Sequence, residues 1–165
     1  MLKEIKNRRS IRRFDQTEID DQTINFIIEM GTWAPSGLNN QPWKFFVIRD
    51  RELKNELSMQ TKYSQIIRES AACIAVFLDF SNSYDRTKDV QAIGACIQNM
   101  LLTIHHLNLG GVWLGEILNN RDSVEALLKV PGNLELMALV ALGRPLETGG
   151  KGIRKPLEQM IIGRK

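Results

Sequence analysis

Apolar positions along the 165-residue chain fall into four short runs separated by longer, mainly amphipathic stretches. The runs cover residues 44–48, 72–80, 112–117 and 134–143. Each has the length of a strand and places apolar residues on both faces, which is typical of strands buried between two layers. The stretches between them have helical spacing, so the pattern predicts helices packed over one sheet.

The strongest helical pattern covers residues 90–109, where Ile93, Ile97, Leu101 and Ile104 recur at helical spacing. Apolar residues cover more than one face of this helix, so we expect it to pack against the sheet and against a second subunit. Gly110 and Gly111 are expected to stop it. Shorter helices are expected at residues 2–9, 17–31, 50–57 and 120–130, with Thr17 and Asp50 as two of the N-caps.

The segment from Trp33 to Trp43, WAPSGLNNQPW, cannot be a helix or a central strand. Its two prolines remove backbone donors, and its glycine permits conformations that other residues avoid. Two interpretations stay open from the pattern alone: a rigid turn between a helix and a strand, or a loop that lines a ligand site. Trp43 itself, like Trp113, is expected in the core.

The composition, with 43% apolar and 25% charged residues, is that of a globular domain, and we expect one domain over residues 1–165. No apolar run approaches the roughly 18 residues that span a bilayer, and the N-terminal residues lack a signal-like apolar stretch. The sequence therefore predicts a cytoplasmic protein with no membrane partner.

The net charge is +3, and basic residues gather near the two ends of the chain. They are Arg8, Arg9, Arg12, Arg13, Lys151, Arg154, Lys155, Arg164 and Lys165. Clustered arginines can bind nucleic acid, hold one small phosphate, or form a solvated face. Stacking aromatic residues and nucleic-acid motifs are missing around these clusters, so we expect no nucleic-acid partner.

The cysteines and histidines do not have the spacing of a metal site. Cys73 and Cys96 lie in separate apolar runs and are expected to be buried free thiols. His105 and His106 are adjacent and cannot share a metal on one helix face. The glycines of residues 110–115 also lack the spacing of a dinucleotide-binding fingerprint, which disfavours a Rossmann site.

Four segments resemble signatures of the FMN-dependent nitroreductase family. Residues 8–14, RRSIRRF, resemble its opening signature, and residues 34–43, APSGLNNQPW, resemble its APS-x-x-N-x-QPW loop. Residues 113–116, WLGE, and 154–157, RKPL, resemble its later signatures. Any one of these alone is weak, but together they appear in the family's order and cover the chain from end to end. The chain looks like a short member of this family.

The resemblance implies an α+β fold with a four-stranded mixed central sheet flanked by helices. It also implies a homodimer with FMN at the subunit interface and a C-terminal arm exchanged between the subunits. The segment from residue 144 to 165 fits such an arm, because it has no partner of its own in a domain of this size.

The resemblance also implies which residues bind the cofactor. Arg8, Ser10 and Arg154 would hold the phosphate and ribityl chain, with Arg9 beside them. Arg12 would lie near the N1–C2 edge of the flavin ring, where a cation favours the reduced state. Arg13 is expected to be a solvated charge.

The remaining cofactor residues come from two other signatures. Pro35, Ser36, Gly37 and Asn39 would approach the ring and ribityl chain from the other subunit. Gly115 and Glu116 would offer backbone N–H groups near N5, the flavin atom that exchanges hydride. Glu116 could also be interpreted as a catalytic acid, but its backbone is preferred here.

The chain departs from the family pattern at three points. The family has a lysine that reaches the flavin, and Lys54 and Lys62 are both possible equivalents, so neither is assigned. Gly152 occupies a second position where the family often has lysine. The connection at residues 81–89 is too short for the helical lid of larger members, so the site is expected to be open or covered by the partner.

The implied activity is transfer of hydride from NADH or NADPH, through FMN, to a nitroaromatic, quinone or similar acceptor. Neither a metal nor a covalent side chain is required, because the cofactor carries the chemistry. The alternatives are another reaction on the same fold, such as reductive dehalogenation or flavin fragmentation, and a non-catalytic flavin carrier or sensor. A small basic nucleic-acid-binding protein is a further alternative from another class.

Overall fold

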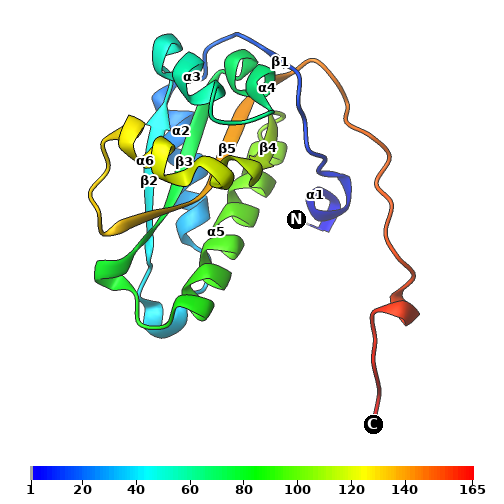
Figure 1. Ribbon diagram of the computed structural model, residues 1–165. Coiled ribbons are helices and arrows are strands. Elements are labelled where there is room, and N and C mark those ends of the chain that lie inside the picture. Colours follow the sequence, from blue (N-terminus) through cyan, green and yellow to red (C-terminus); the bar gives the residue numbers. More distant parts are fainter. Residues whose placement is uncertain (1) are drawn as a thin grey trace.

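The computed structural model describes residues 2–165, with side chains from residue 3 onward, and consists of one sheet covered by helices (Figure 1). The helices are α1 (Leu2–Asn7), α2 (Asp21–Thr32), α3 (Arg51–Ser58), α4 (Ser64–Glu69), α5 (Arg86–His106) and α6 (Arg121–Leu128). The strands are β1 (Phe14–Asp15), β2 (Trp43–Ile48), β3 (Ala72–Asp79), β4 (Gly110–Leu114) and β5 (Leu134–Pro145). Short 3₁₀ turns follow at η1 (Gly37–Asn39), η2 (Phe80–Asn82), η3 (Glu116–Asn120) and η4 (Leu157–Gln159).

The four predicted strands are present, but the expectation of a four-stranded mixed sheet is wrong. The sheet has five strands in the order β2–β3–β5–β4, with β1 paired to the end of β5, and every pair of named strands is antiparallel. A mixed sheet, which the resemblance implied, would contain parallel pairs. Instead α3 and α4 return the chain to the edge where β2 ended, so that Ile48 pairs with Cys73.

The core lies on both faces of the sheet, as the apolar runs predicted. Along β3, Ile74, Val76 and Leu78 pack against α2 and α5 on one face. Cys73, Ala75 and Phe77 point to the other face, toward α3, α4 and α6. Strand side chains alternate between faces, so a run that is apolar at every position requires cover on both sides.

The helix boundaries confirm some of the predicted caps and correct others. Asp50 caps α3 as predicted, with its side chain accepting a hydrogen bond from Leu53 N. Asp20 rather than Thr17 caps α2, because the Thr17 hydroxyl and backbone N–H donate to Asp15 instead. The long helix ends at His106, before Asn108 with a φ of 58°, whereas the two predicted stop glycines lie within β4.

The C-terminal segment runs away from the sheet after β5 and ends far from the body of the chain (Figure 1). Ile153, Leu157, Met160 and Ile162 are exposed along it. Apolar side chains that find no cover in their own chain are typical of a segment that packs on another molecule.

Candidate functional site

The N-terminal segment that carries the predicted phosphate ligands runs alongside β4. Ser10 forms an isolated parallel bridge with Gly111, and Ile11 N donates to Gly111 O over 3.1 Å. Ile11 packs so closely on Gly110 that a Cβ there would lie 2.8 Å from its side chain. Glycines at the start of β4 therefore let this segment lie against the sheet.

Arg8 is a half-buried cation with arginine neighbours. Among residues 2–165, its buried Nε has no hydrogen-bond partner. Burial lowers the pKa of Arg8, and repulsion from Arg154 and Arg9 lowers it further. A buried donor without an acceptor is costly, and the cost is removed when an anion binds it. The cluster of Arg8, Arg9 and Arg154 thus has the donors and charge that fit a phosphate group.

Arg9 has a different role, because its guanidinium binds backbone carbonyls. Its Nε donates to Gly150 O over 3.0 Å, and its Nη1 donates to Lys6 O over 2.7 Å. A Cβ on Gly152 would lie 2.6 Å from the Arg9 guanidinium, so the tail passes directly over it. Glycine in place of the family's lysine allows this contact, and Arg9 holds the tail with Arg154 near Arg8.

Arg12 is exposed beside Ser10, and its Nη1 donates to Ser10 O over 3.4 Å. Its backbone N–H donates to the Glu147 carboxylate over 2.8 Å, which fixes the segment against the start of the tail. Arg13 is also exposed. The structure therefore brings together the predicted residues Arg8, Arg9, Ser10, Arg12 and Arg154.

Gly115 and Glu116 follow β4, the strand beside which Ser10 lies. The Glu116 carboxylate accepts hydrogen bonds from the Thr61 hydroxyl and from Lys62 N, at 3.3 Å for the latter. The hydrogen bond from Thr61 is the main reason that the pKa of Glu116 lies below its usual value. The carboxylate thus binds the α3–α4 connection, which leaves the backbone as the part of Glu116 that can serve a ligand. Thr61 carried no sequence signal.

The two candidate lysines lie in different surroundings. Lys54 is buried and its Nζ donates to Ser70 O over 2.6 Å. Lys62 is exposed, and its backbone adjoins Glu116. Of the two tryptophans expected in the core, Trp43 is buried, with 5% of its surface exposed. The prediction for Trp113 is wrong, because 42% of its surface is exposed, although a Cβ on Gly94 of α5 would lie only 3.9 Å from its ring.

The predicted loop residues form a strained turn. Leu38, Asn39 and Gln41 have φ values of 54°, 54° and 47°, in the left-handed region that leucine and glutamine rarely adopt and asparagine tolerates better. Gln41 N donates to the Ser36 hydroxyl over 3.0 Å and closes the turn. Strain of this kind costs about 1–3 kcal/mol per residue and persists only where surrounding contacts enforce it.

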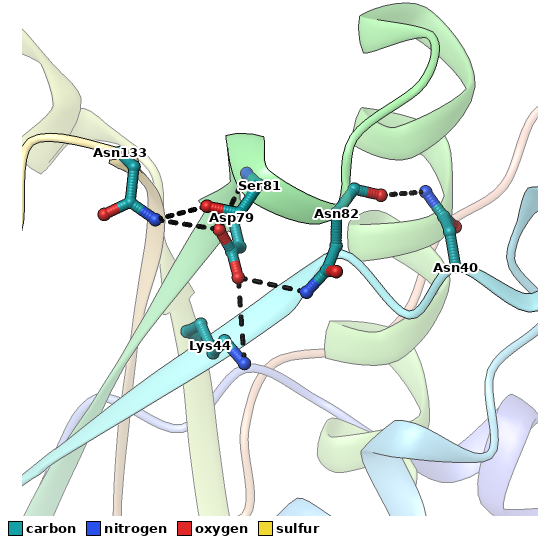
Figure 2. Close-up of polar contacts among 6 residues, drawn as sticks. All are labelled: Asn40, Lys44, Asp79, Ser81, Asn82 and Asn133. Carbon is teal, nitrogen blue, oxygen red and sulfur yellow. Dashed lines mark hydrogen bonds and ion pairs between the residues drawn. The ribbon is translucent and has the colours of Figure 1, made fainter.

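Those contacts come from the connection between β3 and α5 (Figure 2). The Asn40 side chain donates to Asn82 O over 2.8 Å, and Asp79 N donates to Pro42 O over 2.8 Å. The buried Asp79 carboxylate accepts hydrogen bonds from Ser81 N, Asn82 and Asn133, and lies 3.7 Å from Lys44 Nζ. Burial alone would raise the pKa of Asp79, but these donors outweigh it and the pKa is lowered.

The loop and the arginine cluster lie at opposite ends of α5. Asn40 binds Asp89 in the first turn of that helix, whereas Glu4 of α1 lies 3.5 Å from His106 in its last turn. At 1.5 Å per residue, the distance along the axis from Asp89 to His106 is about 25 Å. Within one chain, the structure therefore places the predicted loop residues far from the predicted arginine residues. The loop residues are Pro35, Ser36, Gly37 and Asn39.

Cys73 and Cys96 are buried free thiols, as expected, and burial raises the pKa of Cys73 to about 11 and that of Cys96 to about 12. Over residues 2–165, the His, Cys, Asp and Glu side chains form no group that could hold a metal ion. No helix in this range is both long and apolar enough to cross a bilayer.

A sequence model of the nitroreductase family matches residues 5–59 and 52–144 of the chain. A protein of Archaeoglobus fulgidus, provisionally named NADH dehydrogenase/NAD(P)H nitroreductase, is 36% identical over 148 residues, which cover 87% of this chain and 84% of the relative. The NADPH-flavin oxidoreductase of Vibrio harveyi is 35% identical over 150 residues, covering 83% of this chain and 62% of that protein.

A solved structure from Desulfovibrio desulfuricans, provisionally named a nitroreductase and determined in complex with FMN, superposes with a TM-score of 0.94. It is 43% identical to this chain, and the match covers 99% of this chain and 96% of the other.

Proposed function

The chain belongs to the nitroreductase family, and we propose that it is an FMN-dependent oxidoreductase that passes hydride from NADH or NADPH to a nitroaromatic, quinone or similar acceptor. The observation that carries this proposal is the cluster of Arg8, Arg9 and Arg154, with a buried donor that has no acceptor among the described residues. The FMN in the Desulfovibrio structure supports the same cofactor here. We further propose that residues 1–165 act as one domain and that the protein is cytoplasmic.

The arginine cluster suits the phosphate of FMN better than it suits an uncharged ligand. Arg8 would donate from its buried Nε, and Arg154 would bring a second guanidinium. Charge-assisted hydrogen bonds from arginine to phosphate are short and often paired. Ser10 lies two residues after Arg8 on the same extended segment and would reach the adjoining ribityl hydroxyls.

When bound, FMN would supply the hydride chemistry at its ring, as flavins do. The protein would supply position and charge. Arg12, held near Ser10, would stabilise negative charge at the N1–C2 edge of the reduced ring. The backbone N–H groups of Gly115 and Glu116 would hold the ring near N5. No protein nucleophile or metal is needed in this scheme.

We also propose that two copies of the chain complete each site. The loop with Ser36, Gly37 and Asn39 lies about 25 Å along α5 from the arginine end, too far for one chain to place both on one flavin ring. A partner's loop would fill that gap. A groove of about 540 Å³ between α2 and α5, lined in part by Phe26, Trp33 and Leu102, together with the exposed tail, offers the apolar surface for a homodimer.

The experiment that tests the function is anaerobic reduction of the flavin-loaded protein, followed by absorbance spectroscopy. NADH or NADPH should bleach the flavin bands, and a nitroaromatic or quinone should restore them at a rate that matches steady-state turnover. If neither nicotinamide bleaches the flavin while dithionite does, the protein is a flavin carrier or uses another reductant. If bleached protein is reoxidised only by halogenated aromatics, reductive dehalogenation replaces the proposed reaction.

A further inference from the structure

A second group of cations lines a pocket that contains none of the residues assigned to the flavin, although Lys54, one of the two lysines considered for it, is among them. The pocket has a volume of about 410 Å³ and lies between the segment after β1, the start of α3 and the end of α4. Its charged and amide side chains are Gln16, Glu18, Arg49, Arg51, Lys54, Asn55 and Arg68. The volume lies in the range of about 300–1,000 Å³ that is usual for small-molecule sites.

Lys54 is the buried member of this group, with 8% of its surface exposed. One of its three donor positions is used by Ser70 O at 2.6 Å, and in the described part of the chain no carboxylate lies within ion-pair distance of its Nζ. Burial lowers the pKa of Lys54, and Arg51 lowers it further, while Cys73 and Asp50 act in the opposite direction without offsetting the burial. A buried ammonium group without a counter-ion is rare because charge is costly to desolvate.

The neighbouring arginines are held in place by the fold. Arg49 donates to Ile19 O over 2.5 Å and forms an ion pair with Asp21 at 3.1 Å. Arg68 donates to the hydroxyls of Ser58 and Ser64 over 3.0 and 3.1 Å. Such contacts reduce the freedom that an arginine loses when it binds a ligand.

Arg51 differs from the other two arginines. It is the exposed first residue of α3, and over residues 2–165 no hydrogen bond or ion pair holds its guanidinium. Glu18 is the pocket's single lining carboxylate among the described residues. With Asp21, which pairs with Arg49, and Asp50, which acts on Lys54, three carboxylates lie around the four cations, so one positive charge is left over.

If Lys54 only stabilised the start of β3, that role would explain its contact with Ser70. It would not explain why Arg49, Arg51 and Arg68 line the same cavity, since like charges repel one another. An anion in the cavity would offset the repulsion and occupy the donors that Lys54 has left. Arginine and lysine side chains around a concave pocket are typical of sites for phosphate or related oxyanions.

We propose that this pocket binds a phosphate group, either inorganic phosphate or a small phosphate monoester, between Lys54, Arg51 and Arg68. The site is separate from the proposed flavin site, because the predicted phosphate ligands Arg8 and Arg154 do not line it. It would serve as a second anion site on each chain.

The test is isothermal titration of the FMN-saturated protein with inorganic phosphate, and separately with glycerol 3-phosphate, at constant ionic strength. Saturation with FMN keeps the Arg8 cluster filled, so added phosphate reports on the second site. Arg51→Gln is the main variant, because Arg51 is exposed and its loss should leave the fold intact. Arg13→Gln is the matched control, an exposed arginine outside the pocket. Lys54→Met is a second variant, used where circular dichroism shows that it folds.

Saturable binding in the wild-type protein and in Arg13→Gln, with an affinity about tenfold or more lower in Arg51→Gln, would support the proposal. Loss of one charge-assisted hydrogen bond lowers affinity by about this factor. Binding of both titrants would mean that the phosphoryl group alone is recognised. Binding of inorganic phosphate alone would restrict the site to the free ion. Equal affinity in the wild type and Arg51→Gln, or no saturable binding of either titrant at millimolar concentration, would overturn it.

Discussion

The side-chain amide of Asn40 donates a hydrogen bond to the buried carboxylate of Asp89 over 2.8 Å. The same amide binds Asn82 O, as Figure 2 shows, so one side chain joins the strained loop both to the β3–α5 connection and to the first turn of α5. Ser83 Oγ, Tyr84 N and Asp85 N complete the donors around the carboxylate. The loop proposed to reach the partner's flavin is therefore fixed by the first turn of α5.

Asp89→Asn should lower the free energy of unfolding by about 1.5–3 kcal/mol at pH 7, the range for hydrogen bonds to a charged group. Burial alone would raise the pKa of Asp89, but hydrogen bonds from Ser83, Asn40 and the Tyr84 backbone outweigh it, so the pKa is lowered. This stabilisation is complete above the unfolded pKa of about 3.9 and is lost as the pH falls through the lower folded value.

The difference between Asp89→Asn and wild type should consequently shrink below about pH 4. Urea unfolding at several pH values between neutral and acid would measure it. Asp122→Asn, at an exposed residue in the first turn of α6, is the control and should change stability by less than about 0.5 kcal/mol. A difference that stays constant across this pH range would show that the Asp89 charge is not what stabilises the loop.

Gly37→Ala should disturb the same loop through a steric clash. A Cβ at residue 37 would lie 1.9 Å from the Tyr84 hydroxyl, so the tyrosine ring must move. We expect the free energy of FMN binding to become less favourable by about 1–3 kcal/mol, which is the usual cost of overpacking. The additional change Tyr84→Ala should restore most of the affinity, because it removes the obstructing atoms. A double variant as weak as Gly37→Ala alone would mean that the clash is not the cause.

Arg8→Ala should weaken FMN binding by about 1.5–3 kcal/mol, because a charge-assisted hydrogen bond to phosphate is lost. Arg154→Ala should have a similar effect. Riboflavin lacks the phosphate, so its affinity should be the same in both variants and in wild type. Fluorescence quenching titrations with FMN and riboflavin measure the difference, with Arg13→Ala as the control. Parallel losses for the two flavins would place Arg8 and Arg154 away from the phosphate.

The sequence predicted the parts of this fold that depend on local pattern. The apolar runs predicted four strands, of which β3 is buried at every position, and Asp50 is the helix cap that was predicted. The arginine-rich segment at residues 8–12 was identified from its motif, and the structure places it beside the tail. The strand directions and the cap at Asp20 were not predicted, because each depends on how neighbouring segments turn.

The parts that sequence reasoning missed are contacts between distant positions. Asn40 and Asp89 are 49 positions apart, and Thr61 and Glu116 are 55 positions apart. Asparagine, threonine and acidic residues are common on any polar surface, so nothing local distinguishes a pair that meets in the fold. Only the packing of α5 and η3 against the loops brings these pairs together.

Removal of the chain after Gly149 should abolish both dimerisation and FMN binding. The tail carries Arg154 and exposes Ile153, Leu157 and Ile162, which need cover from another chain. The interface lost would exceed about 2,000 Å² in total if the dimer is obligate. Sedimentation velocity and flavin absorbance measure both properties. The control replaces only Arg154 with alanine, which should weaken flavin binding but leave the dimer. A truncated monomer that keeps its flavin would contradict the shared site.

Arg12→Gln should shift the flavin reduction potential to a more negative value. The Arg12 guanidinium reaches the Ser10 carbonyl, on the segment proposed to follow the flavin, and keeps an exposed positive charge there. A cation near N1 stabilises the reduced ring, and glutamine keeps much of the length without the charge. An interaction of about 2 kcal/mol would correspond to a shift of some 40 mV for a two-electron couple.

Spectroelectrochemistry of the holoprotein would measure this shift, and stopped-flow reduction by NADH should show slower hydride uptake in Arg12→Gln. FMN affinity should fall less than in Arg8→Ala, because the Arg12 charge is proposed to act on the ring and not on the phosphate. Arg13→Gln, one residue further along an extended segment, directs its side chain to the other face and should leave the potential unchanged. An unchanged potential with strongly weakened FMN binding would make Arg12 a phosphate ligand and would require the ring to lie elsewhere.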